Sequence, residues 1–162
     1  MPRFTPQSTK PVAERAVLVG VDRGKGEWTV EESLAELQRL AETDGAVVVT
    51  QVIQRLDRPV PKTYIGSGKV VEIKDLVRAQ DIDVVIFDDE LSPSQQSNLE
   101  RAFGEPIKVI DRTALILDIF GEHARTHEGR LQVQLAQLQY LYPRLRGMWS
   151  HLMGEQTRGG IG

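Results

Sequence analysis

The chain has 162 residues, 40% of them hydrophobic and 27% charged, a composition typical of a soluble globular domain. It contains no cysteine, no apolar run near the roughly 18 residues of a membrane span, and no signal-peptide pattern. These features exclude disulfide frameworks and thiolate chemistry, and we expect a cytoplasmic protein. The net charge of −3 is uneven, because residues 123–162 carry five arginines against two glutamates. This imbalance either indicates that an anionic partner binds at the C-terminal end or is a chance feature of a short segment.

The first part of the chain has the pattern of a β-α-β unit. Residues 1–15 are polar and aperiodic, and we expect a flexible lead-in. Residues 16–21 are an apolar run typical of a buried strand, residues 30–43 repeat leucines at helical spacing, and residues 46–53 are rich in β-branched side chains. Gly45 stands where a helix C-cap is expected. Such a unit predicts a parallel sheet.

The same alternation continues through residue 120. Its clearest boundary is at Ser92, which is placed to cap a helix, with Pro93 at the first helical position and Gln95 placed to close a capping box. Asp111 is a second expected cap. The remaining predicted elements are a loop over 57–68, helices over 70–79, 92–103 and 111–120, and strands over 83–87 and 107–110.

The predicted fold class is therefore α/β. We expect a four-stranded, mostly parallel sheet with helices on both faces, right-handed crossovers and strand order 2-1-3-4. This subdomain would span residues 16–122. Residues 123–162 would form a long C-terminal helix and the chain that follows it.

The stretch from Thr126 to Leu145 predicts that long helix. Its leucines recur at i, i+3 and i+4, which is the apolar stripe of an amphipathic helix. No residue from Leu131 to Pro143 is charged, so the other face is rich in glutamine. We expect a stalk whose stripe is covered either by the body or by a second copy of the chain, and a kink or stop at Pro143. The stripe residues are Leu131, Leu135, Leu138, Leu141 and Leu145.

The run Gly66-Ser67-Gly68-Lys69 resembles part of a phosphate-binding loop but does not complete the motif. Thr63 stands where the first glycine is required, and Val70 stands where serine or threonine should follow the lysine. These glycines either allow a tight turn before a helix or place an anion at the N-terminus of the helix that begins near Lys69.

Three consecutive acidic residues follow the third predicted strand, at the carboxyl edge where open α/β sheets bind ligands. Asp88, Asp89 and Glu90 either form a solvated turn or hold Mg²⁺.

His123 and His127, four residues apart, have zinc-site spacing but no evident third ligand, and we predict no metal site there. No nucleophile is paired with a base, so no catalytic residue is predicted.

The last residues are basic, aromatic and rich in glycine. Arginine pairs with phosphates, tryptophan stacks on unpaired bases, and glycine allows close approach of the backbone to RNA. The alternative is a tryptophan packed under its own helix with solvated charges. The candidate RNA-binding residues are Arg144, Arg146, Trp149, His151, Arg158, Gly159, Gly160, Ile161 and Gly162.

Five segments together resemble the HflX family of translational GTPases. The resemblance runs from about residue 16 to the last residue, and motifs of this length in this order are highly specific. The segments are YIGSGKVVEI at 64–73, DDELSPSQQSNLE at 88–100, VIDRTALILDIF at 109–120, RTHEGRLQVQLAQLQYLYPRL at 125–145 and RGGIG at 158–162.

The resemblance implies that the chain is the N-terminal part of a longer protein that binds the large (50S) ribosomal subunit and splits or rescues stalled ribosomes. In the family, a returning helix and a Ras-like GTPase domain follow, and the loop similar to RGGIG enters the peptidyl transferase region of the RNA. Residues 123–162 would be the first helical arm and the start of that loop.

The resemblance also implies GTP and Mg²⁺ for the full-length protein. The chain itself contains no G-x-x-x-x-G-K-[ST] and only one asparagine, Asn98, which leaves no N-K-x-D. We therefore expect no cofactor and no GTPase activity in these residues.

Some family members bind ATP through the N-terminal region, and the alternative function is an ATP-binding domain. It would use the carboxyl edge of the sheet, through Gly66, Gly68, Lys69, Asp88 and Asp89. A monomer and a dimer joined through the leucine stripe are both consistent with the sequence.

Overall fold

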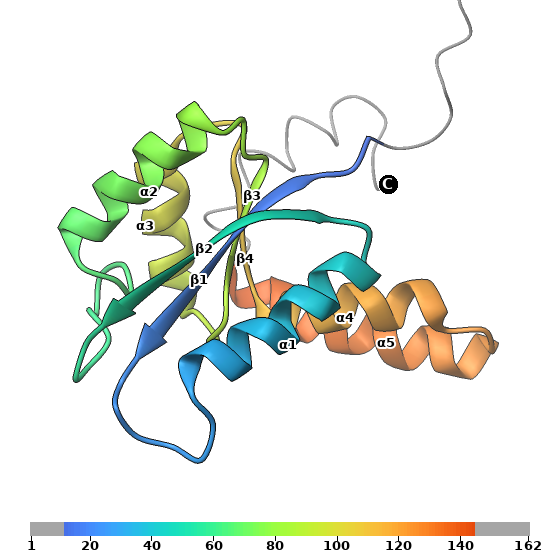
Figure 1. Ribbon diagram of the computed structural model, residues 1–162. Helices are drawn as coiled ribbons and strands as arrows, with labels where there is room; N and C mark the ends of the chain where they lie inside the picture. The colour runs from blue at the N-terminus through green and yellow to red at the C-terminus, as the bar shows by residue number, and fades with distance from the viewer. Residues whose placement is uncertain (1–11, 145–162) are drawn as a thin grey trace, which may run out of the picture.

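A computed structural model describes residues 12–144 as a parallel four-stranded sheet with helices on both faces (Figure 1). The strand order β2-β1-β3-β4 and the parallel pairing confirm the prediction. In register, Leu18 of β1 lies beside Ile86 of β3, which in turn lies beside Ile110 of β4. The strands are β1 (Arg15–Asp22), β2 (Val47–Arg55), β3 (Val84–Phe87) and β4 (Lys108–Asp111).

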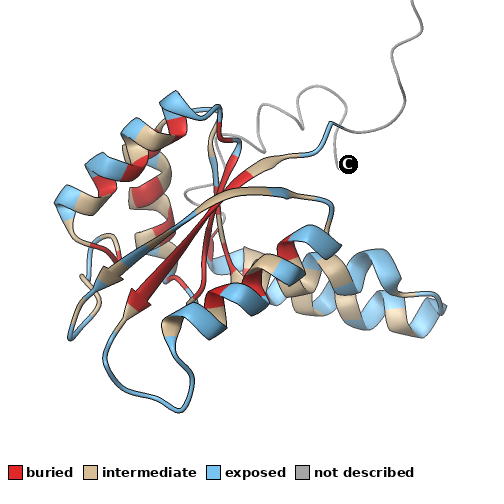
Figure 2. Ribbon diagram, in the orientation of Figure 1, coloured by how far each residue is buried: buried red, intermediate tan, exposed pale blue. Residues whose placement is uncertain are grey.

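Two hydrophobic cores lie on the two faces of the sheet, because successive side chains of a strand point to opposite faces. Val17 and Val19 of β1 belong to the core under α2 (Ser67–Ala79) and α3 (Pro93–Phe103). Leu18, between them, belongs to the core under α1 (Val30–Thr43) and α4 (Arg112–His123). The buried residues therefore follow the strands through the middle of the molecule (Figure 2).

The predicted helix boundaries hold where local capping chemistry sets them. The Ser92 hydroxyl accepts from the Gln95 N–H, and the Gln95 side chain accepts from the Ser92 N–H, which closes the capping box. Asp111 caps α4 through the Ala114 N–H. Two expected boundaries shift: α2 begins at Ser67 rather than Val70, and α4 continues past Phe120.

The long C-terminal helix is α5 (His127–Leu141), followed by a short 3-10 turn, η1 (Tyr142–Arg144). Thr126 caps it through the Gly129 N–H, and the regular helix stops just before Pro143, as predicted. Helices α4 and α5 form an antiparallel pair that projects from the sheet, and α5 runs back toward the body (Figure 1). The predicted stalk is therefore formed by α4 and α5 together, and the end of α5 returns to the body, where η1 packs against α3.

The leucine stripe faces outward. Leu131, Leu135 and Leu138 are 51%, 56% and 64% exposed, and the outer surface of α5 is pale blue in Figure 2. The expectation that the body covers this stripe is wrong for these three leucines. The opposite face lies on α4: Gln137 donates to the Leu117 carbonyl at 3.2 Å, and a Cβ at Gly121 would come within 2.8 Å of the Gln137 amide nitrogen. Pairing of two copies through the stripe stays a prediction.

None of the helices between residues 12 and 144 combines the length and the apolar character needed to cross a membrane.

Candidate functional site

The carboxyl edge of the sheet carries an ion pair between the buried carboxylate of Asp88 and the partly exposed guanidinium of Arg112. Asp88 follows β3 and is 8% exposed. Its Oδ1 accepts from Arg112 Nη2 at 2.5 Å and Nε at 3.1 Å, and its Oδ2 accepts from the Ser33 hydroxyl at 2.6 Å. Both carboxylate oxygens are therefore engaged by donors of the protein itself.

Arg112 joins three elements at this edge. Besides Asp88, its guanidinium donates to the Ser33 carbonyl at 3.0 Å and to the Glu36 carboxylate at 3.1 Å, both on α1. Arg112 is the first residue of α4, so the network ties α1 and α4 to the end of β3. Sequence reasoning missed Ser33 and Arg112, since they lie 55 and 24 residues from Asp88 and no local motif links them.

The glycine-lysine segment lies at the start of α2. Gly66 is the N-cap of α2, and its N–H donates to the Gln54 side chain at 2.9 Å. Space around Gly68 is open, and Lys69 forms an ion pair with Glu72 of its own helix at 2.7 Å. The Gly66 donor, the Lys69 ammonium and the Asp88 carboxylate therefore each have a partner within the protein, and nucleotide binding through these residues stays a prediction.

The side chain of Asp89 lies beside Tyr64. Tyr64 is buried, its ring meets Phe87 edge to face with centroids 6.4 Å apart, and its backbone φ is 67°. Burial raises the pKa of the Tyr64 hydroxyl, and the neighbouring Asp89 raises it further. Asp88 is therefore paired with residues of α1 and α4, whereas Asp89 interacts with Tyr64.

Arg144 is inside the protein, which corrects the prediction that it faces RNA. It is 7% exposed. Its guanidinium donates to the Gln96 side chain at 3.1 Å, and to the carbonyls of Tyr140 at 2.9 Å and Leu91 at 2.5 Å. It also stacks over the Tyr140 ring, 3.8 Å from the centroid. Charge pattern alone cannot distinguish this buried arginine from an exposed one such as Arg130.

The other predicted RNA-binding residues lie outside the described residues. They are Arg146, Trp149, His151, Arg158, Gly159, Gly160, Ile161 and Gly162.

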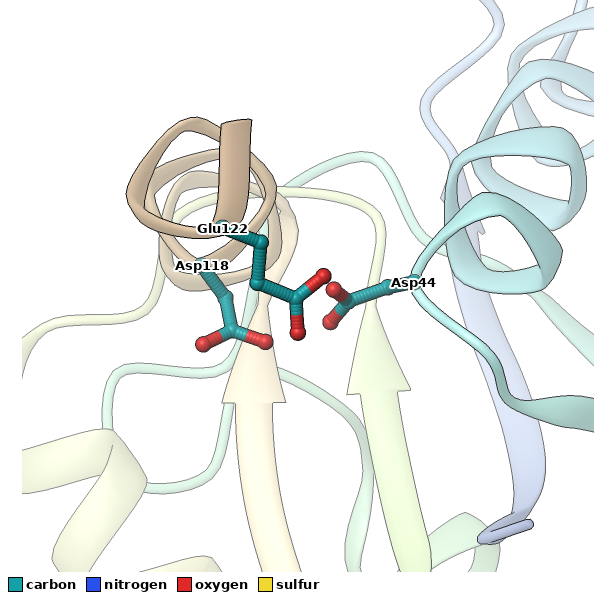
Figure 3. Close-up of side chains that lie close together, drawn as sticks. All are labelled: Asp44, Asp118 and Glu122. Atoms are coloured by element: carbon teal, nitrogen blue, oxygen red, sulfur yellow. The ribbon is translucent and has the colours of Figure 1, made fainter. Parts of the chain in front are cut away.

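Three carboxylates meet at the opposite, amino edge of the sheet. Asp44 follows α1, and Asp118 and Glu122 are one turn apart on α4; each offers an oxygen within 4.8 Å of the others (Figure 3). Asp44 and Glu122 also lie at helix C-termini, where the helix dipole disfavours negative charge. A bound proton or a cation would relieve this repulsion. Sequence reasoning missed the cluster, although the i, i+4 spacing of Asp118 and Glu122 was a local signal.

The proton on Asp44 makes stability depend on pH. Burial, with the neighbouring carboxylates of Asp118 and Glu122, raises the pKa of Asp44 to about 8. An unfolded chain releases that proton near pH 4, so between about pH 4 and 8 the folded state binds more protons than the unfolded state. Stability contributed by this group is therefore lost as pH rises through that window.

We expect Asp44→Asn to be more stable than the parent chain at pH 8 and to flatten the dependence of stability on pH between 5 and 8. Urea unfolding followed by circular dichroism at several pH values measures both effects. Asp75→Asn, which removes an exposed carboxylate on α2, is the matched control and should keep the parent's slope. An Asp44→Asn curve parallel to the parent's curve would contradict the assignment.

The two histidines do not share a helix. His123 ends α4 and His127 begins α5, with the Thr126 cap between them, and both are exposed. The condition for a zinc pair, two histidines on one helical face, is therefore not met.

Comparison with protein families divides the chain in two. Residues 31–121 match the family described as GTP-binding GTPase N-terminal, and residues 123–162 match the GTP-binding GTPase middle region. The first match covers more than half of the chain, and its end coincides with the last turn of α4.

Individual proteins of known family are also similar to the chain in sequence. The chain is 47% identical over 150 residues to GTPase HflX of Flavobacterium psychrophilum, covering 92% of this chain and 35% of the relative. It is 48% identical over 131 residues to GTPase HflX of Escherichia coli, covering 81% of this chain and 30% of the relative. The chain therefore spans about a third of the length of the curated relatives it matches.

Solved structures show the same fold. A crystal structure of SsGBP in complex with GDP superposes with a TM-score of 0.63 at 26% identity, covering 90% of this chain and 40% of that one. A GTP-binding protein from the archaeon Sulfolobus solfataricus, also in complex with GDP, superposes with a TM-score of 0.61 at 24% identity, covering 88% and 42%.

Proposed function

The chain belongs to the HflX family of GTPases, matching its N-terminal and middle regions, and from this we propose that it is a ribosome-binding module that contacts RNA of the large subunit. In this proposal the contact is made by the residues after Arg144, and the module serves the splitting or rescue of ribosomes. The observation that carries it is the separation of charge along the chain.

Residues 1–122 carry 15 lysines and arginines against 21 acidic residues, whereas residues 123–162 carry five arginines against two glutamates. RNA is a polyanion, so the C-terminal part can approach it while the acidic body is repelled. Because Arg144 is buried, the proposal assigns the phosphate contacts to Arg146 and Arg158. Arg125 and Arg130 are exposed at the far end of the α4–α5 pair, and Arg146 and Arg158 follow η1 in sequence.

The chemistry of residues 145–162 suits unpaired RNA. Two arginines can pair with phosphates in a bidentate manner, Trp149 can stack on a base, and the Gly159-Gly160 pair allows the backbone to approach the nucleic acid closely. A protein contact of this kind depends on salt, because each neutralised phosphate releases counterions.

The test measures binding of the 162-residue chain to purified large ribosomal subunits over a range of salt concentrations. We expect the Arg146→Ala/Arg158→Ala double variant to bind more weakly and to lower the slope of log K against log salt by about 1.5. Arg39→Ala/Arg78→Ala, which removes two exposed arginines from the body, should keep the parent's slope. Equal slopes for the parent and the first double variant would overturn the RNA contact.

GTP and Mg²⁺ belong, in this proposal, to the full-length protein. The relatives named as GTPases are about two and a half times as long as this chain, and three of the predicted nucleotide residues, Gly66, Lys69 and Asp88, already have partners within the protein. No observation at the carboxyl edge favours ATP binding there.

A further inference from the structure

Arg144 is surrounded by parts of the chain that are distant in sequence. Its contacts come from the loop before α3, from α3 itself and from α5, through Leu91, Gln96 and Tyr140. Gln96 is itself buried and donates to the Val109 carbonyl of β4 at 3.0 Å. A buried guanidinium with this set of acceptors is held in one orientation, because every displacement leaves a charged donor without its partner.

The backbone of Leu91 is held from both sides. Its N–H donates to Asp111 Oδ2 at 2.9 Å, and its carbonyl accepts from Arg144 at 2.5 Å. The other oxygen of Asp111 caps α4 through the Ala114 N–H. One loop residue therefore ties the beginning of α4 to the end of η1, so that both ends of the α4–α5 pair are fixed to the body at the same point.

Arg144 is also the last described residue, and the segment proposed to contact RNA follows it directly. The geometry points to Arg144 as a positioning residue: we propose that it makes no RNA contact itself but fixes where residues 145–162 leave the body. This inference rests on the proposed function. The guanidinium matters here for its fork of donors rather than for its charge, and lysine cannot reproduce that fork.

The Arg144→Lys variant therefore distinguishes a residue that contacts RNA phosphate from a buried residue that holds the chain in position. A phosphate contact would tolerate Arg144→Lys, because the charge remains, whereas a buried anchor would not. We expect Arg144→Lys and Arg144→Met to weaken binding to the large subunit by about tenfold each, as expected for lost charged hydrogen bonds. Neither should change the slope of log K against log salt, because no phosphate contact is lost. Gln96→Met, which removes an acceptor of Arg144 from a buried site, should weaken binding in the same way.

Trypsin provides a measurement without RNA, since it cleaves after arginine and after lysine. We expect cleavage after residue 144 to be slow in the parent and at least about tenfold faster in Arg144→Lys and Gln96→Met, because opening of the anchor then costs less. Cleavage after exposed Arg130 is the internal control and should not change. Circular dichroism of each variant confirms that the sheet is still folded.

Two results would overturn the inference. One is Arg144→Lys binding like the parent while Arg144→Met lowers the salt slope by about 0.7 to 0.9, which is the behaviour of a phosphate contact. The other is trypsin cleavage after Arg144 in the parent as fast as after Arg130. A parent chain that does not bind the large subunit would overturn the proposed function instead, and the trypsin rates would then decide the anchor independently.

Discussion

Replacing Arg112 with methionine is expected to lower the free energy of unfolding by about 3 kcal/mol, because it leaves Asp88 buried without its counter-charge. The guanidinium also holds Ser33 and Glu36 of α1, so the loss should be felt between α1 and α4. Urea denaturation monitored by circular dichroism gives the change directly, with the m-value showing whether the unfolded surface is the same.

An exposed ion pair of the same chemistry is the matched control. Arg55 lies 3.4 Å from Asp22 with the two side chains 60% and 42% exposed, and Arg55→Met should cost less than about 1 kcal/mol. Adding Asp88→Asn to Arg112→Met should recover part of the loss, because the uncompensated charge is then removed. Equal costs at Arg112 and Arg55 would show that the buried pair contributes no more than a surface one.

Asp111→Ala is expected to be similarly damaging, at about 3 kcal/mol. This fully buried carboxylate accepts from two backbone N–H groups, those of Leu91 and Ala114, and alanine leaves both without a partner. Asp111→Asn should recover part of the loss, because its single amide oxygen can replace only one of the two acceptors. Thermal and urea unfolding of the three chains measure the series.

Thr126→Ala serves as the reference for an ordinary cap. Thr126 accepts one N–H at the start of α5 and is exposed, so its loss should cost about 1 kcal/mol. If Asp111→Ala costs no more than Thr126→Ala, then Asp111 is only a helix cap and does not also hold the loop before α3.

The sequence predicts the sheet well because its signals are local. Each strand is a short apolar, β-branched run, and three of the four helices that follow the strands begin at a residue whose own side chain completes the cap, as Ser92 and Asp111 do; α2, capped by Gly66, is the exception. Strand order then follows from right-handed crossovers between parallel strands. These elements need no knowledge of which distant residues touch.

The helix pair and the site depend on distant contacts, and there the sequence is a poorer guide. Leucine spacing did not predict which face of α5 lies on α4, because Gln137 bonds to α4 and Gly121 lets the helices approach on the face away from the exposed leucines. The burial of Arg144 depends on Gln96 and Leu91, about 50 residues earlier. Nothing in the local pattern separates such an arginine from one on the surface.

Helix α4 packs against the sheet on one side and against α5 on the other, and this affects how the chain folds. Leu115 lies in the core against the sheet, while Leu117 and Gly121 meet α5 on the other side. The limit between the two family regions, at residues 121–123, therefore falls within one packed helix pair and not between two separate bodies. During synthesis, the burial of α4 cannot be completed until α5 has left the ribosome, so we expect folding of the two regions to be coupled in time.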